Sequence, residues 1–258
     1  DTLCLHDALP IFDALSYLAV IGSLLMMRLH ERKIPVRVPG RHLGHELKDG
    51  IRYAINFKPV AGLLLILALV SLMGMPYMVL LPMIVSERLH GGAMLLGSLT
   101  GMSGLGALVG VLYLASRKSV LGLGKVIWIS SATFGIGLIG FSLSHWSPLS
   151  MVFIFIAGMG MMVHLASGNT ILQTIVDEDK RGRVMSLYTM SVAGMVPFGS
   201  LFSGFIAKYL GAATTIFIGG VACLGGSFLF FKALPSIREH IRPIYRGLGI
   251  LPKLPEDL

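Results

Sequence analysis

The sequence carries little charge, because only 13% of its 258 residues are Asp, Glu, Lys or Arg. Soluble domains carry about twice that fraction. Hydrophobic residues make up 54% of the chain, and the mean hydropathy is +0.79. A water-soluble fold of this size could not bury so much apolar surface. We therefore expect the lipid bilayer to be the main partner of this chain.

Cysteine and the common catalytic motifs are also scarce. Cys4 and Cys223 lie far apart, and Cys223 falls within an apolar run, so neither a disulfide framework nor a metal site is indicated. His42, His45 and Glu46 read H-x-x-H-E, which differs from the zinc motif H-E-x-x-H. The sequence contains no phosphate-binding G-x-x-x-x-G-K-S/T loop. These observations predict no enzyme, cofactor or metal.

Basic residues outnumber acidic ones, and the formal net charge is +8. Such a balance can indicate nucleic-acid binding. In this chain, however, the basic residues lie in short segments between long apolar runs. We therefore expect them to set the orientation of membrane spans, and we predict no nucleic-acid partner.

Long apolar stretches dominate the rest of the sequence. A helix needs roughly 20 such residues to cross a bilayer core. Seven stretches come close to or exceed that length: residues 11–27, 60–85, 91–116, 126–144, 148–176, 184–207 and 209–231. They are much longer than the ~10-residue alternating strands of outer-membrane barrels, and helices satisfy their own backbone hydrogen bonds in lipid. The sequence therefore predicts an all-α membrane protein of about seven transmembrane helices.

Lys and Arg divide the connections between these stretches into two sets. Nineteen of the 21 lie in alternate segments, namely 28–58, 117–125, 180–183 and the region from 232 onward. Because basic loops stay in the cytoplasm, we expect a multi-pass protein of the inner or plasma membrane with a cytoplasmic C-terminus. The first span would then begin outside, so we expect further spans to precede it.

The expected organisation follows from these patterns. The first ten residues, DTLCLHDALP, break the apolar pattern and resemble translated sequencing-adapter sequence. Leucine and isoleucine recur every fourth residue from Leu43 to Ile55, which predicts an amphipathic helix at the membrane surface. The predicted parts are a non-native or truncated leader (1–10), a first span (11–29), a central cytoplasmic loop (30–59), a six-helix bundle (60–232) and a cytoplasmic tail (233–258).

Prolines interrupt two of the predicted spans. Pro76 and Pro82 lie in the second span and Pro197 in the sixth. Each removes a helix hydrogen bond and bends the helix. Transporters often place such breaks beside the substrate path, while a static kink is common in any membrane helix. Tyr77, next to Pro76, would line a cavity or lie in an aromatic belt.

Polar side chains inside a membrane span are costly and usually functional. The fifth span carries His164 near its middle, and Asn169 and Gln173 one helical turn apart. A strip that lines a substrate cavity and plain interhelical hydrogen bonding explain these residues equally well. His164 could also relay a proton, because the imidazole pKa is ordinarily about 6.5.

The segment 177–188, DEDKRGRVMSLY, is the most specific local feature. Asp177 precedes Arg181, Gly182 and Arg183 at the junction with a predicted span. Acidic and basic side chains in this order can form an ion-pair network that latches the cytoplasmic side in one conformation and releases it in another. The alternative is orienting charge with a turn at Gly182.

At these residues the chain resembles the major facilitator superfamily, and in particular its branch of enterobactin-exporter-like permeases and transmembrane secretion effectors. The matching stretches are ELKDGIRY at 46–53, GMPYMVLLP at 74–82, LHGG at 89–92 and RGRVMSLY at 181–188. The resemblance covers about residues 12–234. It implies spans six to twelve of a twelve-helix protein, whose N-terminal half would be the partner of this one.

That family rocks two six-helix bundles about a cavity at mid-membrane. The first and fourth helices of each half usually line the cavity, which here makes candidates of Pro76, Tyr77, His164, Asn169 and Gln173. The resemblance implies a secondary active transporter that exports a small amphipathic, siderophore- or drug-like compound by proton-coupled alternating access. A membrane anchor, sensor or assembly subunit without transport is the second hypothesis, and an intramembrane enzyme is the third.

Overall fold

A computed structural model describes residues 17–18, 20–26, 43–117, 119–247 and 249–250. The chain falls into two units, Asp1–Arg41 and His42–Leu258. In the first unit, residues 17–18 and 20–26 are helical. The remainder of the predicted span at 11–29, and the predicted leader at 1–10, lie outside the described residues.

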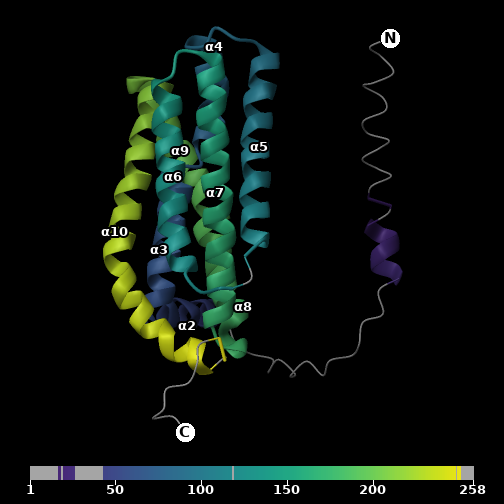
Figure 1. Ribbon diagram of the computed structural model, residues 1–258, viewed down its shortest axis with the longest axis vertical. Helices are drawn as coiled ribbons and strands as arrows, with labels where there is room; N and C mark the ends of the chain where they lie inside the picture. The colour runs from purple at the N-terminus through teal and green to yellow at the C-terminus, as the bar shows by residue number, and fades with distance from the viewer. Residues whose placement is uncertain (1–16, 19, 27–42, 118, 248, 251–258) are drawn as a thin grey trace. The chain divides into compact units, whose positions relative to one another are not determined.

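The second unit is a bundle of helices, and its described residues contain no strand. Its elements in chain order are α2 (Leu43–Asn56), α3 (Lys58–Met73), α4 (Tyr77–Glu87), α5 (Ala93–Ala115), α6 (Leu123–Leu143), α7 (Ser147–Ile175), α8 (Glu178–Thr189), the π-helical turn η1 (Met190–Gly194), α9 (Met195–Leu210) and α10 (Ala212–Gly247) (Figure 1). Among the described residues, six helical stretches are long and apolar enough to cross a membrane: Lys58–Glu87, Ala93–Ala115, Leu123–Leu143, Ser147–Ile175, Glu178–Leu210 and Ala212–Gly247. The prediction of an all-α membrane fold is confirmed.

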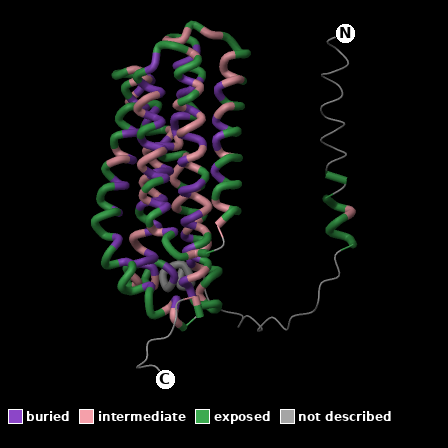
Figure 2. The backbone as a smooth tube through the Cα atoms, in the orientation of Figure 1, coloured by how far each residue is buried: buried purple, intermediate pink, exposed green. Residues whose placement is uncertain are grey.

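The long helices pack in a continuous series. α7 lies between α5 and α6, α6 packs on α10, and α10 packs on α3. α9 completes the bundle by contacting both α3 and α10. Figure 2 shows buried residues along the inner sides of these helices and exposed residues along their outer sides. The exposed side of α9 is apolar, with Phe198, Leu201 and Phe205 each more than 60% exposed. Such a surface suits lipid or another apolar helix.

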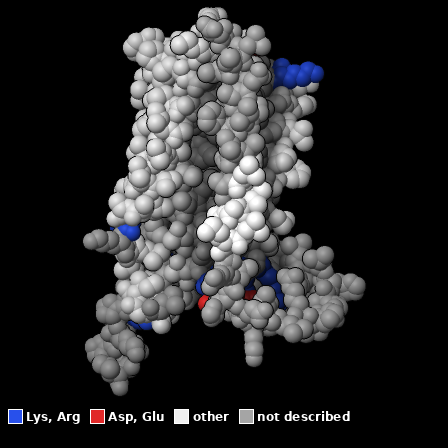
Figure 3. Space-filling view, turned by 90° about the vertical axis from the view of Figure 1, so that its right-hand side faces the viewer, with Lys and Arg blue, Asp and Glu red and all other residues white. Residues whose placement is uncertain are grey.

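On the face shown in Figure 3, charged side chains gather toward one end of the bundle. The face in Figure 3 carries its Lys, Arg, Asp and Glu groups in the lower part, with one basic group at the upper end. At that upper end Arg88 lies after α4, and its Nη2 is 2.9 Å from Nε2 of His145, which precedes α7. This contact ties two of the less basic connections together.

α3 and α4 are two parts of one span, separated at Gly74–Pro76 as the proline predicts. The break lies where three helices approach one another closely. A Cβ atom on Gly199 of α9 would collide with the carbonyl oxygen of Leu72. A Cβ atom on Gly219 of α10 would collide with that of Met73. Glycine is therefore required at both positions, because the backbones themselves are in contact.

The sixth predicted span is also irregular. α8 continues through η1 into α9, so helix extends from Glu178 to Leu210, beyond both ends of the predicted 184–207. The widened π-helical turn comes just before Pro197, whose ring clashes with the carbonyl of residue i−4 in a regular helix. The predicted weak point around Pro197 is thus a π-helical turn.

Two amphipathic segments lie at the lower end of the bundle in Figure 1. The predicted helix in the central loop is α2, which buries Gly50 and Ala54 but leaves Ile51 and Ile55 exposed. α10 runs on to Gly247, past residue 232 where the sequence predicts that the bundle ends. Its continuation is held by buried side chains at helical spacing, namely Leu234, Ile237, Ile241 and Tyr245.

Candidate functional site

The lower half of α7 presents a pair of amide side chains on its exposed side. Nε2 of Gln173 donates a hydrogen bond to Oδ1 of Asn169 over 2.9 Å. Gln173 is exposed and Asn169 is half-buried. Asn169 lies six residues before the end of α7, or about 9 Å along the axis. The predicted shared face of these two residues is therefore present, and it points outward from the bundle.

His164 lies on the opposite side of the same helix. Five residues correspond to about 500° of rotation, so His164 and Asn169 are about 140° apart around α7. The imidazole is 0% exposed, and its Nδ1 is 3.4 Å from the carbonyl oxygen of Ile127 on α6. Its Nε2 has no partner among the described residues. The structure thus separates His164 from the Asn169–Gln173 pair.

Tyr77 and Pro76, at the start of α4, also lie inside the bundle. The Tyr77 side chain is 3% exposed, and its hydroxyl is 2.9 Å from Oγ of Ser103 on α5. Its ring packs edge-on against Phe134 of α6, with centroids 6.1 Å apart. Pro76 is buried against Gly199. Ser103 could not be recognised as the partner from the sequence, because that serine lies in a run of glycines and apolar residues.

The contact between Tyr77 and Ser103 should contribute measurably to stability. In a double-mutant cycle of Tyr77→Phe and Ser103→Ala, we expect a coupling energy of about 1 kcal/mol, since interhelical hydrogen bonds in membranes are worth about 0.6–2 kcal/mol. Unfolding in mixed detergent micelles measures it. Tyr209→Phe, at an exposed tyrosine of α9, serves as the control and should be neutral. A coupling energy near zero would contradict the hydrogen bond.

The predicted latch segment, residues 177–188, consists of Asp177 and nearly all of helix α8. Oδ2 of Asp177 accepts a hydrogen bond from Nζ of Lys180 over 3.0 Å. The same ammonium group lies 5.0 Å from the ring centroid of Tyr53 on α2. Burial, and then the nearby Asp177 carboxylate, raises the pKa of the Tyr53 hydroxyl. Lys180, which the sequence did not single out, therefore connects Asp177 to the central loop.

The arginines of this segment take different positions. Arg181 is exposed and Arg183 is half-buried against α2, where the Cβ position of Gly50 is 3.4 Å from Cβ of Arg183. Gly182 lies inside helix α8, so the prediction of a turn at this residue is wrong. Charged side chains of α2 and α8 also line a cavity of about 290 Å³ between the two helices, with Arg52, Lys180 and Arg183 among its lining residues.

Comparison with known proteins agrees with this architecture. Residues 8–244 match a family described as transmembrane secretion effector. Over 183 residues the chain is 26% identical to the staphyloferrin A transporter of Staphylococcus aureus (strain NCTC 8325 / PS 47). That match covers 70% of this chain and 45% of the relative, so the chain spans less than half the length of the curated relative. Because the family match covers most of the sequence, the chain belongs to the transmembrane secretion effector family, a branch of the major facilitator superfamily.

Proposed function

We propose that this chain forms one wall of the substrate cavity of a secondary active transporter. The transporter exports a small amphipathic compound of siderophore or drug type by proton-coupled alternating access. Its second wall comes from another six-helix bundle, and the protein resides in the inner or plasma membrane with the C-terminus in the cytoplasm. The family description and the name of the relative support transport of a small molecule.

The observation that carries this proposal is the Asn169–Gln173 pair. Asn169 lies about 9 Å inside the end of an apolar helix, and its amide, hydrogen-bonded to Gln173, would be unfavourable against lipid. Irregular or polar surface at membrane depth is tolerated where it faces protein or a water-filled cavity. A cavity between this bundle and a second one satisfies that condition. In such a cavity, the two amides can donate hydrogen bonds to a polar group of the substrate and accept them from it.

The other site residues have supporting roles in this proposal. The break at Gly74–Pro76 and the turn η1 are points where the span can bend during alternating access. Asp177, Lys180 and Tyr53 join α2 to α8 at the cytoplasmic end and hold one conformation. His164, whose Nε2 has no partner among the described residues, is the side chain inside the bundle that we assign to proton coupling.

Thiol labelling tests the cavity. In the intact protein, with its native cysteines replaced, Asn169→Cys and Gln173→Cys should react with a membrane-impermeant thiol reagent. Ser167→Cys is the matched control, because Ser167 is 0% exposed and lies two residues away on the same helix. We expect its labelling to be about tenfold slower or more, since a buried thiol is inaccessible. Staphyloferrin A, the first compound to test, should protect the two reactive positions if it is a substrate.

Two outcomes would contradict the proposal. If Asn169→Cys and Gln173→Cys are as unreactive as Ser167→Cys, the bundle is sealed, as expected for a membrane anchor or assembly subunit. If they react but an imposed pH gradient leaves the flux of the protecting compound unchanged, proton coupling is wrong while the cavity stands.

A further inference from the structure

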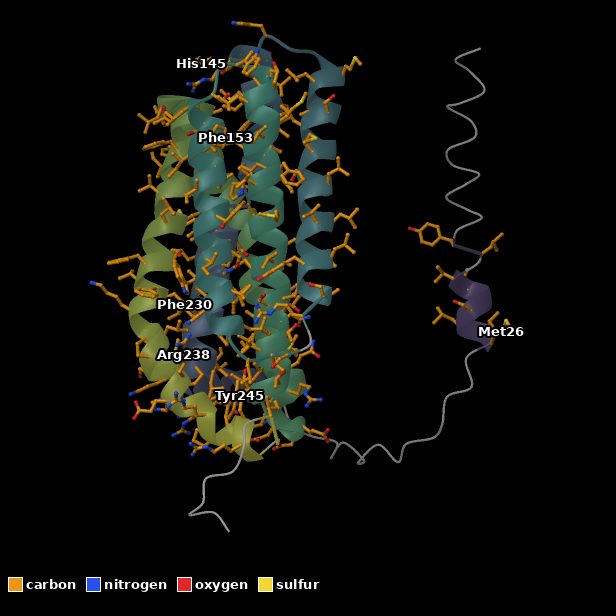
Figure 4. All side chains as sticks on the ribbon, in the orientation of Figure 1. Met26, His145, Phe153, Phe230, Arg238 and Tyr245 are labelled. Atoms are coloured by element: carbon orange, nitrogen blue, oxygen red, sulfur yellow. The ribbon has the colours of Figure 1, made fainter. Side chains whose placement is uncertain are left out.

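The lower part of α10 borders a second cavity, which the proposed transport path does not use. The cavity has a volume of about 250 Å³ and lies among α3, α6, α7 and α10. Its lining is mostly apolar and includes Leu63, Ile171, Phe230 and Leu234, whereas Arg238 and Arg242 contribute charge. Figure 4 shows Phe230, Arg238 and Tyr245 following one another down this part of α10.

The two arginines give the cavity an electropositive edge. Arg238 and Arg242 are one helical turn apart and both exposed. Lys232 and Arg246 lie before and after them, while Glu239 is the only acidic residue between positions 232 and 247 of the sequence. The cavity is therefore apolar inside and cationic at its edge, at the same end of the bundle as the basic connection 117–125.

The size of the cavity limits its occupant. Pockets that enclose a whole drug-sized molecule measure about 300–1,000 Å³. A cavity of about 250 Å³ holds only part of a larger amphiphile, whose remainder stays outside. A phospholipid meets this condition, because the rest of its chains continue into the bilayer. Its phosphate can accept hydrogen bonds from guanidinium groups, and basic pockets between membrane helices bind anionic headgroups.

We propose that this cavity is a binding site for an anionic phospholipid of the cytoplasmic leaflet. Part of an acyl chain packs against Phe230, Leu234 and their apolar neighbours, while Arg238 and Arg242 bind the phosphate. The site rests on the membrane fold and on the charge of α10. It does not depend on transport, so it can fail or hold independently of the proposed function.

Tryptophan fluorescence tests the site in the intact protein. The chain has two tryptophans. Trp128 of α6 lies one helical turn from Gly124, which lines the cavity, and its ring centroid is 5.0 Å from that of Phe231, the residue after the lining Phe230. Trp146 precedes α7 at the other end of the bundle. With Trp146 and any tryptophan outside this chain replaced by phenylalanine, the protein is reconstituted into nanodiscs. Two lipid mixtures are compared, because bromine quenches tryptophan fluorescence on contact. In one, brominated phosphatidylglycerol is mixed with unlabelled phosphatidylcholine; in the other, brominated phosphatidylcholine is mixed with unlabelled phosphatidylglycerol.

We expect Trp128 to show a preference of about tenfold for the brominated anionic lipid, from two basic groups near a membrane surface. Arg238→Gln with Arg242→Gln should reduce that preference to about twofold or less. Arg246→Gln is the matched control, since it removes one charge from the same helix without touching the cavity lining, and it should keep the preference.

Four results would overturn the proposal. These are equal quenching by both lipids, a preference that survives the double substitution, and a preference that the Arg246→Gln control loses as well. The fourth concerns the source of the phosphate. If millimolar inorganic phosphate abolishes the preference at constant ionic strength, the site binds a free anion and the lipid assignment is wrong.

Discussion

Gly106→Val will detach α5 from α7 and lower the free energy of unfolding by about 2–3 kcal/mol, the upper range for overpacking. A Cβ atom on Gly106 would collide with the carbonyl oxygen of Phe155 and lie 3.0 Å from the amide nitrogen of Met159. Both obstacles are α7 backbone, which cannot move aside as a flexible side chain can. The change should appear as a lower midpoint of thermal or detergent unfolding.

Gly104→Val provides the matched control for this substitution. Gly104 lies two residues earlier on α5, and a Cβ atom there has no neighbour within 4 Å. Valine has the same intrinsic effect on the helix at both positions, so the difference between the variants isolates the helix contact. We expect Gly104→Val to stay within about 0.5 kcal/mol of the parent protein. Equal stability of the two variants would show that α5 does not pack on α7 in this way.

A disulfide between α2 and α8 will stop transport, if the contact between these helices must open in each cycle. The Cβ position of Gly50 is 3.4 Å from Cβ of Arg183, close to the roughly 3.5–4.5 Å of natural disulfides. We therefore expect Gly50→Cys with Arg183→Cys to cross-link readily in a background without native cysteines. Oxidation should lower the transport rate about tenfold or more, because a locked conformation cannot alternate.

The same protein before and after reduction is the control for this experiment. Arg183→Cys removes a charge from the latch segment, so the rate of the reduced double variant is the reference. Each single-cysteine variant should be indifferent to the oxidant. Efficient cross-linking with an unchanged transport rate would show that α2 and α8 stay together throughout the cycle, and the latch hypothesis would then be wrong.

Hydropathy was sufficient to predict the six long apolar helices among the described residues, because apolar length is the dominant requirement in lipid. Hydropathy could not predict which side of each helix faces the other helices. Tyr77 and Asn169 belong to spans that are apolar all round, and such helices show no contrast between a lipid side and a protein side. The burial of Tyr77 and the partial exposure of Asn169 follow from packing between helices.

The glycine pairs of α5 also show that sequence spacing alone does not predict which residues contact another helix. The pairs Gly97/Gly101 and Gly106/Gly110 have identical G-x-x-x-G spacing, yet only the second lies against α7.

The extension of α10 was predictable in principle, because Leu234, Ile237 and Ile241 have helical spacing that continues beyond Lys232. In the latch segment, Lys180 and Arg181 both follow Asp177 within one helical turn, so the sequence could not decide which would pair with it.

The break between α3 and α4 has a consequence for which residues near it can be replaced. The carbonyl oxygens of Leu72 and Met73 occupy the space that a side chain on Gly199 or Gly219 would need, so main-chain atoms help to set the geometry of the break. A substitution at either glycine should therefore disturb the break more than a substitution at an exposed position nearby.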